Sequence, residues 1–169
     1  PGEALLLGGH TAVMDAGELL QYGPTAAVFH KPQSLRVARA FSDPPMNLIA
    51  GAAATDGVQL QAGPKLAIRL PGAAPGSLIR SLTIGIRASA LRLSARPGDV
   101  ALPGKVDLTE ISGSDTFVHV QTALGDLVAQ LTGVHPFELG APITLYLSPE
   151  QAYVFDAQGA LLIAPAPRN

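Results

Sequence analysis

The chain has 169 residues with 18 glycines and 15 prolines, only 14% charged residues and a formal net charge of −2. Its 47% of hydrophobic residues excludes a disordered chain, and the lack of cysteine excludes a disulfide scaffold, a thiolate metal site and a cysteine nucleophile. The sequence lacks the stripe of basic residues that is typical of nucleic-acid binders. Every apolar run is interrupted before it reaches the length that spans a bilayer.

The N-terminal region predicts a β-hairpin. Two short apolar runs, 11–14 and 18–22, flank the turn residues Asp15-Ala16-Gly17. Two such runs separated by a short segment that contains glycine are typical of antiparallel strands joined by a tight turn. Gly23-Pro24 ends the pairing, because proline cannot donate a hydrogen bond to a neighbouring strand.

Two short helices are expected to follow the hairpin. Pro24 suits the start of the first helix, which Pro32 ends. Ser34 is a candidate N-cap of the second helix, and Pro44 marks its limit, since the residue before a proline avoids helical geometry. One face of this second helix is expected to hold Leu35, Ala38 and either Phe41 or Ser42.

From Met46 onward, alternating apolar and polar residues predict β-strands. They are expected at 58–61, 66–69, 82–87, 106–111, 117–121, 127–131 and 143–147. Turn signals separate these runs, at Asp56-Gly57, Gly63-Pro64, Pro97-Gly98-Asp99, Pro103-Gly104, Gly113-Ser114-Asp115, Gly125-Asp126 and Gly140. Many short strands at this spacing indicate a sandwich or a small barrel.

The sequence holds no recognisable catalytic constellation. No lysine carries the flanking glycines of a phosphate-binding loop, and no G-x-S-x-G nucleophile elbow occurs. None of the four histidines has a partner at zinc-binding spacing: they are His10, His30, His119 and His135. We therefore predict no catalytic residue, no cofactor ligand and no metal ligand.

Several motifs in chain order resemble one known family. Residues 10–23 resemble the last hairpin of an ABC-transporter ATPase domain, residues 23–32 the helix after it, and residues 37–47 the P-x-M-N hinge into its accessory domain. Gly85-Ile86-Arg87 is similar to the start of that domain's G-I-R-P-E-H segment. Residues 110–120 resemble its E-x-x-G-S-E-T-x-V-H-V hairpin. Residues 140–156 resemble its closing segment with the motif P-E-x-x-h-x-F-D, in which h is Tyr or His.

The resemblance is to the ATP-binding subunits of carbohydrate and glycerol-phosphate importers, and it implies a C-terminal fragment of such a subunit. The implied fold is mainly β, an OB-like (TOBE) small β-barrel preceded by a short hairpin and two short helices. Residues 1–45 would be the C-terminal remnant of the ATPase domain and residues 46–169 the TOBE-type domain. The phosphate loop, the Asp-Glu motif and the L-S-G-G-Q signature are absent, and Ala88-Ser89-Ala90 replaces the family's P-E-H.

The resemblance implies a non-catalytic regulatory and dimerisation region. ATP and Mg would act in the full-length parent, whose partners would be a second copy of itself and the membrane-spanning permease subunits. Its place would be cytoplasmic, at the inner face of the plasma membrane. The residues expected at dimer or regulatory contacts are Arg87, Gly113, Ser114 and Asp115. Neither nucleic acid nor direct membrane insertion is expected.

Three other functions stay open. The main alternative is a stand-alone OB-type domain that binds a small ligand or oxyanion, for which the hydroxyl and amino groups would come from Ser112, Ser114, Thr116 and Lys105. A nucleic-acid binder would need aromatic residues interleaved with basic ones, and Phe117, Tyr146, Tyr153 and Phe155 lack such neighbours. An enzyme of another class is disfavoured by the missing catalytic groups.

Overall fold

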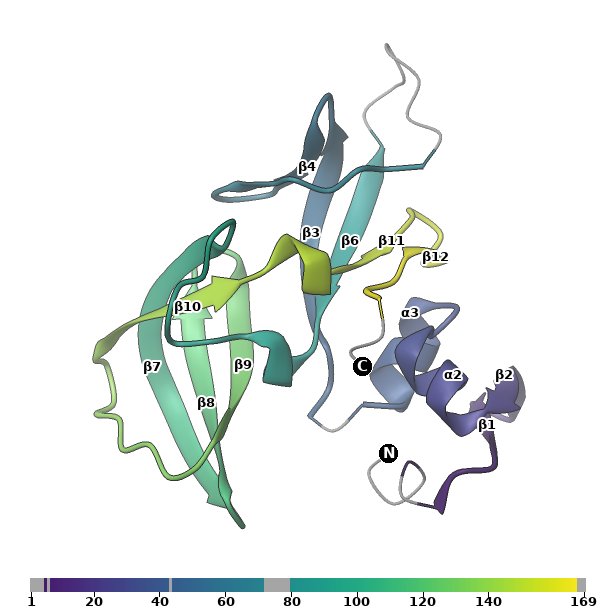
Figure 1. Ribbon diagram of the computed structural model, residues 1–169, viewed down its shortest axis with the longest axis horizontal. Coiled ribbons are helices and arrows are strands. Elements are labelled where there is room, and N and C mark those ends of the chain that lie inside the picture. Colours follow the sequence, from purple (N-terminus) through teal and green to yellow (C-terminus); the bar gives the residue numbers. More distant parts are fainter. Residues whose placement is uncertain (1–4, 6, 43, 72–79, 167–169) are drawn as a thin grey trace.

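The computed structural model describes residues 5, 7–42, 44–71 and 80–166 (Figure 1). The predicted hairpin is formed by β1 (His10–Asp15) and β2 (Glu18–Pro24). Ala16 and Gly17 have φ values of 50° and 79° in the turn. Two consecutive positive φ values are the geometry of a type I′ turn, whose twist matches that of the paired strands.

The two predicted helices are α2 (Thr25–His30) and α3 (Leu35–Ala40). The Ser34 hydroxyl accepts a hydrogen bond from the Val37 backbone N–H at 3.3 Å, so the predicted N-cap is confirmed. Hairpin and helices share a small core of three buried valines, against which Leu20 and Phe41 pack. These valines are Val13, Val28 and Val37.

The β region contains a four-stranded antiparallel sheet in the order β10-β7-β8-β9. Its strands are β7 (Val100–Ser112), β8 (Asp115–Thr122), β9 (Gly125–Thr132) and β10 (Pro142–Leu147). Strand β7 is long and curved, and a bulge shifts its register between Val106 and Leu108 (Figure 1). β10 pairs only with residues 100–105 of β7, so β7, β8 and β9 continue beyond it as a three-stranded extension, which we call the β7–β8 arm after the turn at its tip.

A second sheet has six strands in the order β12-β11-β6-β3-β4-β5. They are β3 (Asn47–Ala54), β4 (Gly57–Leu60), β5 (Lys65–Leu66), β6 (Ser81–Ile86), β11 (Tyr153–Phe155) and β12 (Leu161–Ile163). Two 3-10 turns, η1 (Ala88–Ala90) and η2 (Pro149–Gln151), connect the sheets. The main core lies between the two sheets. One buried cluster contains Ile84 and Ile86 from the second sheet together with Val118 and Leu145 from the first.

The predicted mainly-β fold is confirmed, with three local differences. Pro103-Gly104 lies inside β7 and is not a turn. Gly104 suits a strand here, since an added Cβ would lie 2.4 Å from the Gln121 carbonyl oxygen of β8. The strand expected at 66–69 is limited to β5. Strands β3, β11 and β12 were not predicted individually, and β3 has the sequence N-L-I-A-G-A-A-A, which does not alternate.

The N-terminal elements pack directly on the β region. Ala38 of α3 belongs to a buried cluster with Met46, Tyr153 and Phe155. The backbone N–H of Leu35 also donates to the Gly159 carbonyl at 2.9 Å. The predicted domain boundary between residues 45 and 46 stays a prediction, since the buried cluster of Ala38, Met46, Tyr153 and Phe155 contains residues from both sides of it.

Among the described residues, no helix has the length and apolar character needed to cross a membrane.

Candidate functional site

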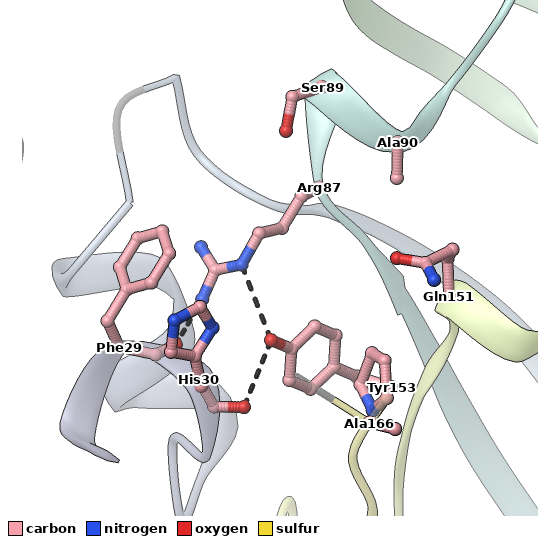
Figure 2. Close-up of a pocket in the computed structure, with 9 residues that line it drawn as sticks. Phe29, His30, Arg87, Ser89, Ala90, Gln151, Tyr153 and Ala166 are labelled. Carbon is pink, nitrogen blue, oxygen red and sulfur yellow. Dashed lines mark hydrogen bonds between the residues drawn. The ribbon is translucent and has the colours of Figure 1, made fainter. Parts of the chain in front are cut away.

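The most highly connected charged side chain at the junction of the N-terminal elements and the β region is Arg87. It directly follows β6 and precedes η1, and its guanidinium reaches the end of α2 (Figure 2). The guanidinium carbon lies 3.7 Å from the centre of the Phe29 ring and 5.4 Å from that of Tyr153. A cation over two aromatic faces is attracted by their π electrons, and the attraction grows as water is excluded.

The same guanidinium makes a hydrogen-bond network with three segments. Its Nη2 donates to the Phe29 carbonyl, its Nη1 to the Ser42 hydroxyl at 3.4 Å, and its Nε to the Tyr153 hydroxyl at 3.4 Å. Tyr153 in turn donates to the His30 carbonyl at 3.0 Å. The last carbonyls of a helix have no intrahelical partner, so Arg87 and Tyr153 satisfy two such groups of α2.

A cavity of about 240 Å³ opens beside this network (Figure 2). It is bounded by the end of α2, the β6–η1 connection, η2 with β11, and residues 165–166. The lining residues are Phe29, His30, Arg87, Ser89, Ala90, Gln151, Tyr153, Pro165 and Ala166. None of these described lining residues has a carboxylate, and Arg87 contributes a permanent positive charge.

Two of the sequence motifs meet beside this site. Gly85 precedes Ile86 and Arg87, and a Cβ added to Gly85 would lie 2.5 Å from the sulfur of Met46. The next residue, Asn47, donates its amide to the Val128 carbonyl at 2.8 Å and accepts from the Val128 N–H at 2.8 Å. The M-N and G-I-R motifs therefore form one packed unit that also binds the edge strand β9.

The structure places Arg87 apart from the other predicted contact residues. Gly113 and Ser114 form an exposed two-residue turn at the tip of the β7–β8 arm. The Ser114 carbonyl accepts from the Gly133 N–H at 2.7 Å, and Asp115 accepts from the Gln130 amide at 2.9 Å. Arg87 contacts its own chain, and the contact with a second copy stays a prediction for all four residues.

The residues of the oxyanion alternative do not gather at one point. The buried Thr116 hydroxyl is occupied, since it donates to the Gly133 carbonyl at 2.7 Å and accepts from the His135 N–H at 3.0 Å. Lys105 is paired with Gln121, far along β7 from the turn at Ser114. At a rise of roughly 3.3 Å per residue, the seven residue steps of strand from Lys105 to Ser112 span about 23 Å.

Sequence reasoning identified Arg87 but not its partners. Phe29 and Tyr153 are 58 and 66 residues away from Arg87 along the chain, and no local pattern connects them. The family resemblance was the only sequence feature that pointed to these three segments, because the helix with Phe29, the G-I-R motif and the closing segment with Tyr153 each resemble the family separately.

For metals, the described part of the chain shows no group of three or more His, Cys, Asp or Glu residues that could hold an ion.

Comparison with known proteins identifies a domain family for the segment that contains Arg87 and Tyr153. The family model for the TOBE domain matches residues 84–155. The ends of that match are neighbours in space, because Ile84 of β6 is the register partner of Val154 of β11. The matched segment thus closes on itself and contains both Arg87 and Tyr153.

Relatives extend the match to nearly the whole chain. The sn-glycerol-3-phosphate import ATP-binding protein UgpC of Pectobacterium atrosepticum is 30% identical over 159 residues, which is 94% of this chain and 44% of the relative. That of Chromobacterium violaceum is 31% identical over 156 residues, covering 92% of this chain and 42% of the relative. Residues 84–155 therefore match the TOBE domain, and the chain is similar along 92–94% of its length to ATP-binding proteins of importers.

The chain spans less than half the length of the curated relatives it matches. Among solved structures, the cytoplasmic molybdate-binding protein ModG with molybdate bound covers 64% of this chain and 94% of its own, at 17% identity and a TM-score of 0.49.

Proposed function

We propose that this chain is the non-catalytic regulatory and dimerisation region of the ATP-binding subunit of an ABC importer. The observation that carries the proposal is the match to import ATP-binding proteins over 92–94% of the chain, through the hairpin, the helices and the TOBE domain together. The sequence lacks the phosphate loop and the signature motif, which fits a region that does not itself hydrolyse ATP.

The full-length parent would bind ATP and Mg and drive solute uptake together with permease subunits. The relatives are named for sn-glycerol 3-phosphate import, which supports a solute of the glycerol-phosphate or sugar type. A subunit with this role would work at the cytoplasmic face of the plasma membrane, bound there through the permeases.

The dimer contact would be at the end of the β7–β8 arm. We call the exposed residues Ile111, Ser114 and Val134 the tip patch. The side chains of Ile111 and Val134 are 57% and 64% exposed, although both are large and apolar. Gly133 is hydrogen-bonded to Ser114, so Val134 lies next to the turn. Apolar residues with few charges are the composition expected at the centre of a protein–protein interface.

Sedimentation equilibrium of the purified 169-residue chain tests this proposal. We expect a reversible dimer, with a mass that approaches twice 17.3 kDa as the concentration rises. Ile111→Asp should weaken dimerisation about tenfold, since a carboxylate would be buried in the contact. Leu19→Asp is the matched control, because Leu19 is also 57% exposed but lies on the β1–β2 hairpin. A strict monomer, or equal weakening by both variants, would contradict the proposal.

A further inference from the structure

The cavity beside Arg87 has a positive electrostatic character. The lining residues that the structure describes include one guanidinium and no carboxylate, and Arg87 has no ion pair within the same part of the chain. By contrast, Arg36 and Arg92 each pair with at least one aspartate. A half-buried cation that faces a cavity without a counter-charge attracts small anions.

The lining also offers hydrogen-bond donors. A guanidinium has five N–H groups, and three of those of Arg87 have acceptors in the described part of the chain. One N–H on each terminal nitrogen is therefore available. Gln151 and Ser89 add an amide and a hydroxyl to the lining, and in Figure 2 Gln151 lies on the side away from Phe29.

The size and polarity of the cavity restrict the ligand. About 240 Å³ is below the roughly 300–1,000 Å³ typical of pockets for drug-sized molecules. A guanidinium matches the geometry of carboxylate and phosphate oxygens, while Phe29, Ala90 and Pro165 give the cavity an apolar wall. We propose that this cavity binds a small oxyanion, one that presents a phosphate or carboxylate group to Arg87.

Such a ligand would contact both parts of the chain. His30 and Phe29 come from the N-terminal elements, whereas Ser89 and Gln151 come from the β region. Binding would therefore stabilise the arrangement in which α2 lies against the β6–η1 connection, because a ligand stabilises the state that binds it. This inference does not depend on dimerisation, so its failure and that of the proposed function are distinguishable.

Isothermal titration calorimetry of the 169-residue chain tests the site, with inorganic phosphate and acetate as probes at constant ionic strength set by sodium chloride. We expect saturable binding of one equivalent of at least one probe. Phosphate binding alone would assign a phosphate-bearing ligand, and acetate binding alone a carboxylate-bearing one. If neither probe binds saturably, the proposal is overturned.

A charge substitution locates the binding. Gln151→Glu would place a carboxylate in the cavity, where it repels the anion and competes for Arg87, so affinity should fall at least about tenfold. Gln61→Glu adds the same charge on an exposed residue outside the lining and should leave affinity within about twofold. Circular dichroism should show the same fold in both variants. Equal loss of affinity in both would place the binding elsewhere and refute the site.

Discussion

At the residue scale, the Tyr153 hydroxyl is central to the junction. It accepts from Arg87 and donates to the His30 carbonyl, and the residue is only 3% exposed. A buried hydroxyl with two partners contributes more than an exposed one, since its removal leaves those partners without a hydrogen bond. The junction therefore depends on individual polar atoms as well as on apolar packing.

We expect Tyr153→Phe to lower the free energy of unfolding by about 1–2 kcal/mol, measured by urea titration with circular dichroism. Tyr22→Phe is the matched control, because Tyr22 is 65% exposed on the hairpin, and it should change stability by less than about 0.5 kcal/mol. Equal effects of the two substitutions would show that the junction network contributes nothing.

A second residue-scale feature is the pair of Arg92 and Asp99. The Asp99 side chain is 3% exposed and accepts hydrogen bonds from the Arg92 guanidinium and from the Arg96 backbone N–H. Burial alone would raise the pKa of Asp99, but the Arg96 N–H and the Arg92 charge together hold the pKa below its usual value. The native state thus favours the ionised carboxylate.

The resulting stabilisation depends on pH in a defined direction. Because the pKa of Asp99 is lower in the folded than in the unfolded chain, its contribution is complete above the unfolded pKa of about 3.9 and is lost as pH falls through the folded pKa. Asp99→Asn should lower the urea midpoint at pH 7, and the difference from the wild type should shrink below about pH 4. A difference that stays constant down to pH 2 would contradict this assignment.

At the element scale, the Asn47 side chain connects the two sheets through hydrogen bonds like those between paired strands. β9 is the edge strand of its sheet, and the Asn47 amide makes the two hydrogen bonds with Val128 that a neighbouring strand would make. Asn47 is 7% exposed, so these bonds are largely shielded from water. This contact gives a physical role to the asparagine of the P-x-M-N motif.

Replacing the Asn47 side chain should loosen β9. Asn47→Ala is expected to cost about 1–3 kcal/mol, because it leaves the Val128 N–H and carbonyl without partners. Hydrogen exchange at the Val128 amide should accelerate by the corresponding factor, while the Leu131 amide, three residues further along β9, should respond less. Unchanged protection at Val128 would rule out the pairing.

Close packing of β7 against β8 leads to a further expectation. A Cβ at Gly104 would meet the Gln121 carbonyl oxygen at 2.4 Å and the Val120 side chain at 2.6 Å. Gly104→Ala should therefore destabilise the chain by about 1–3 kcal/mol in thermal or urea unfolding. Gly23→Ala is the control, since its Cβ would have only an ordinary contact with Val28 at 3.6 Å. If both alanines are tolerated equally, the sheet is not packed this tightly.

The success of the sequence predictions follows from the range of the interactions involved. The hairpin, the Ser34 cap and strands such as β8 and β10 were predictable, because turn residues, caps and alternation act within a few residues. Pro103-Gly104 was misread because the same dipeptide suits a turn and a strand that approaches its neighbour closely. The Arg87 partners required tertiary structure, since no local pattern encodes contacts across 58 residues or more.

At the scale of the whole molecule, two regions of the chain differ in how far their side chains are buried. The junction around Arg87 joins the N-terminal elements to the TOBE domain through hydrogen bonds, aromatic contacts and a shared cluster. In the tip patch at the far end of the β7–β8 arm, the apolar side chains are instead largely exposed. We infer that the junction preserves the internal arrangement and that the tip patch contacts the second copy.

Disulfide trapping at the tip patch tests this account most directly, because the chain contains no cysteine. Ser114→Cys lies in the exposed turn at the centre of the proposed contact, and Ser81→Cys, at an exposed serine that begins β6, is the control. Under mild oxidation at low concentration, the account predicts rapid, high-yield covalent dimers for Ser114→Cys and slow, low-yield dimers for Ser81→Cys. Equal rates for the two variants would contradict a dimer formed through the tip patch.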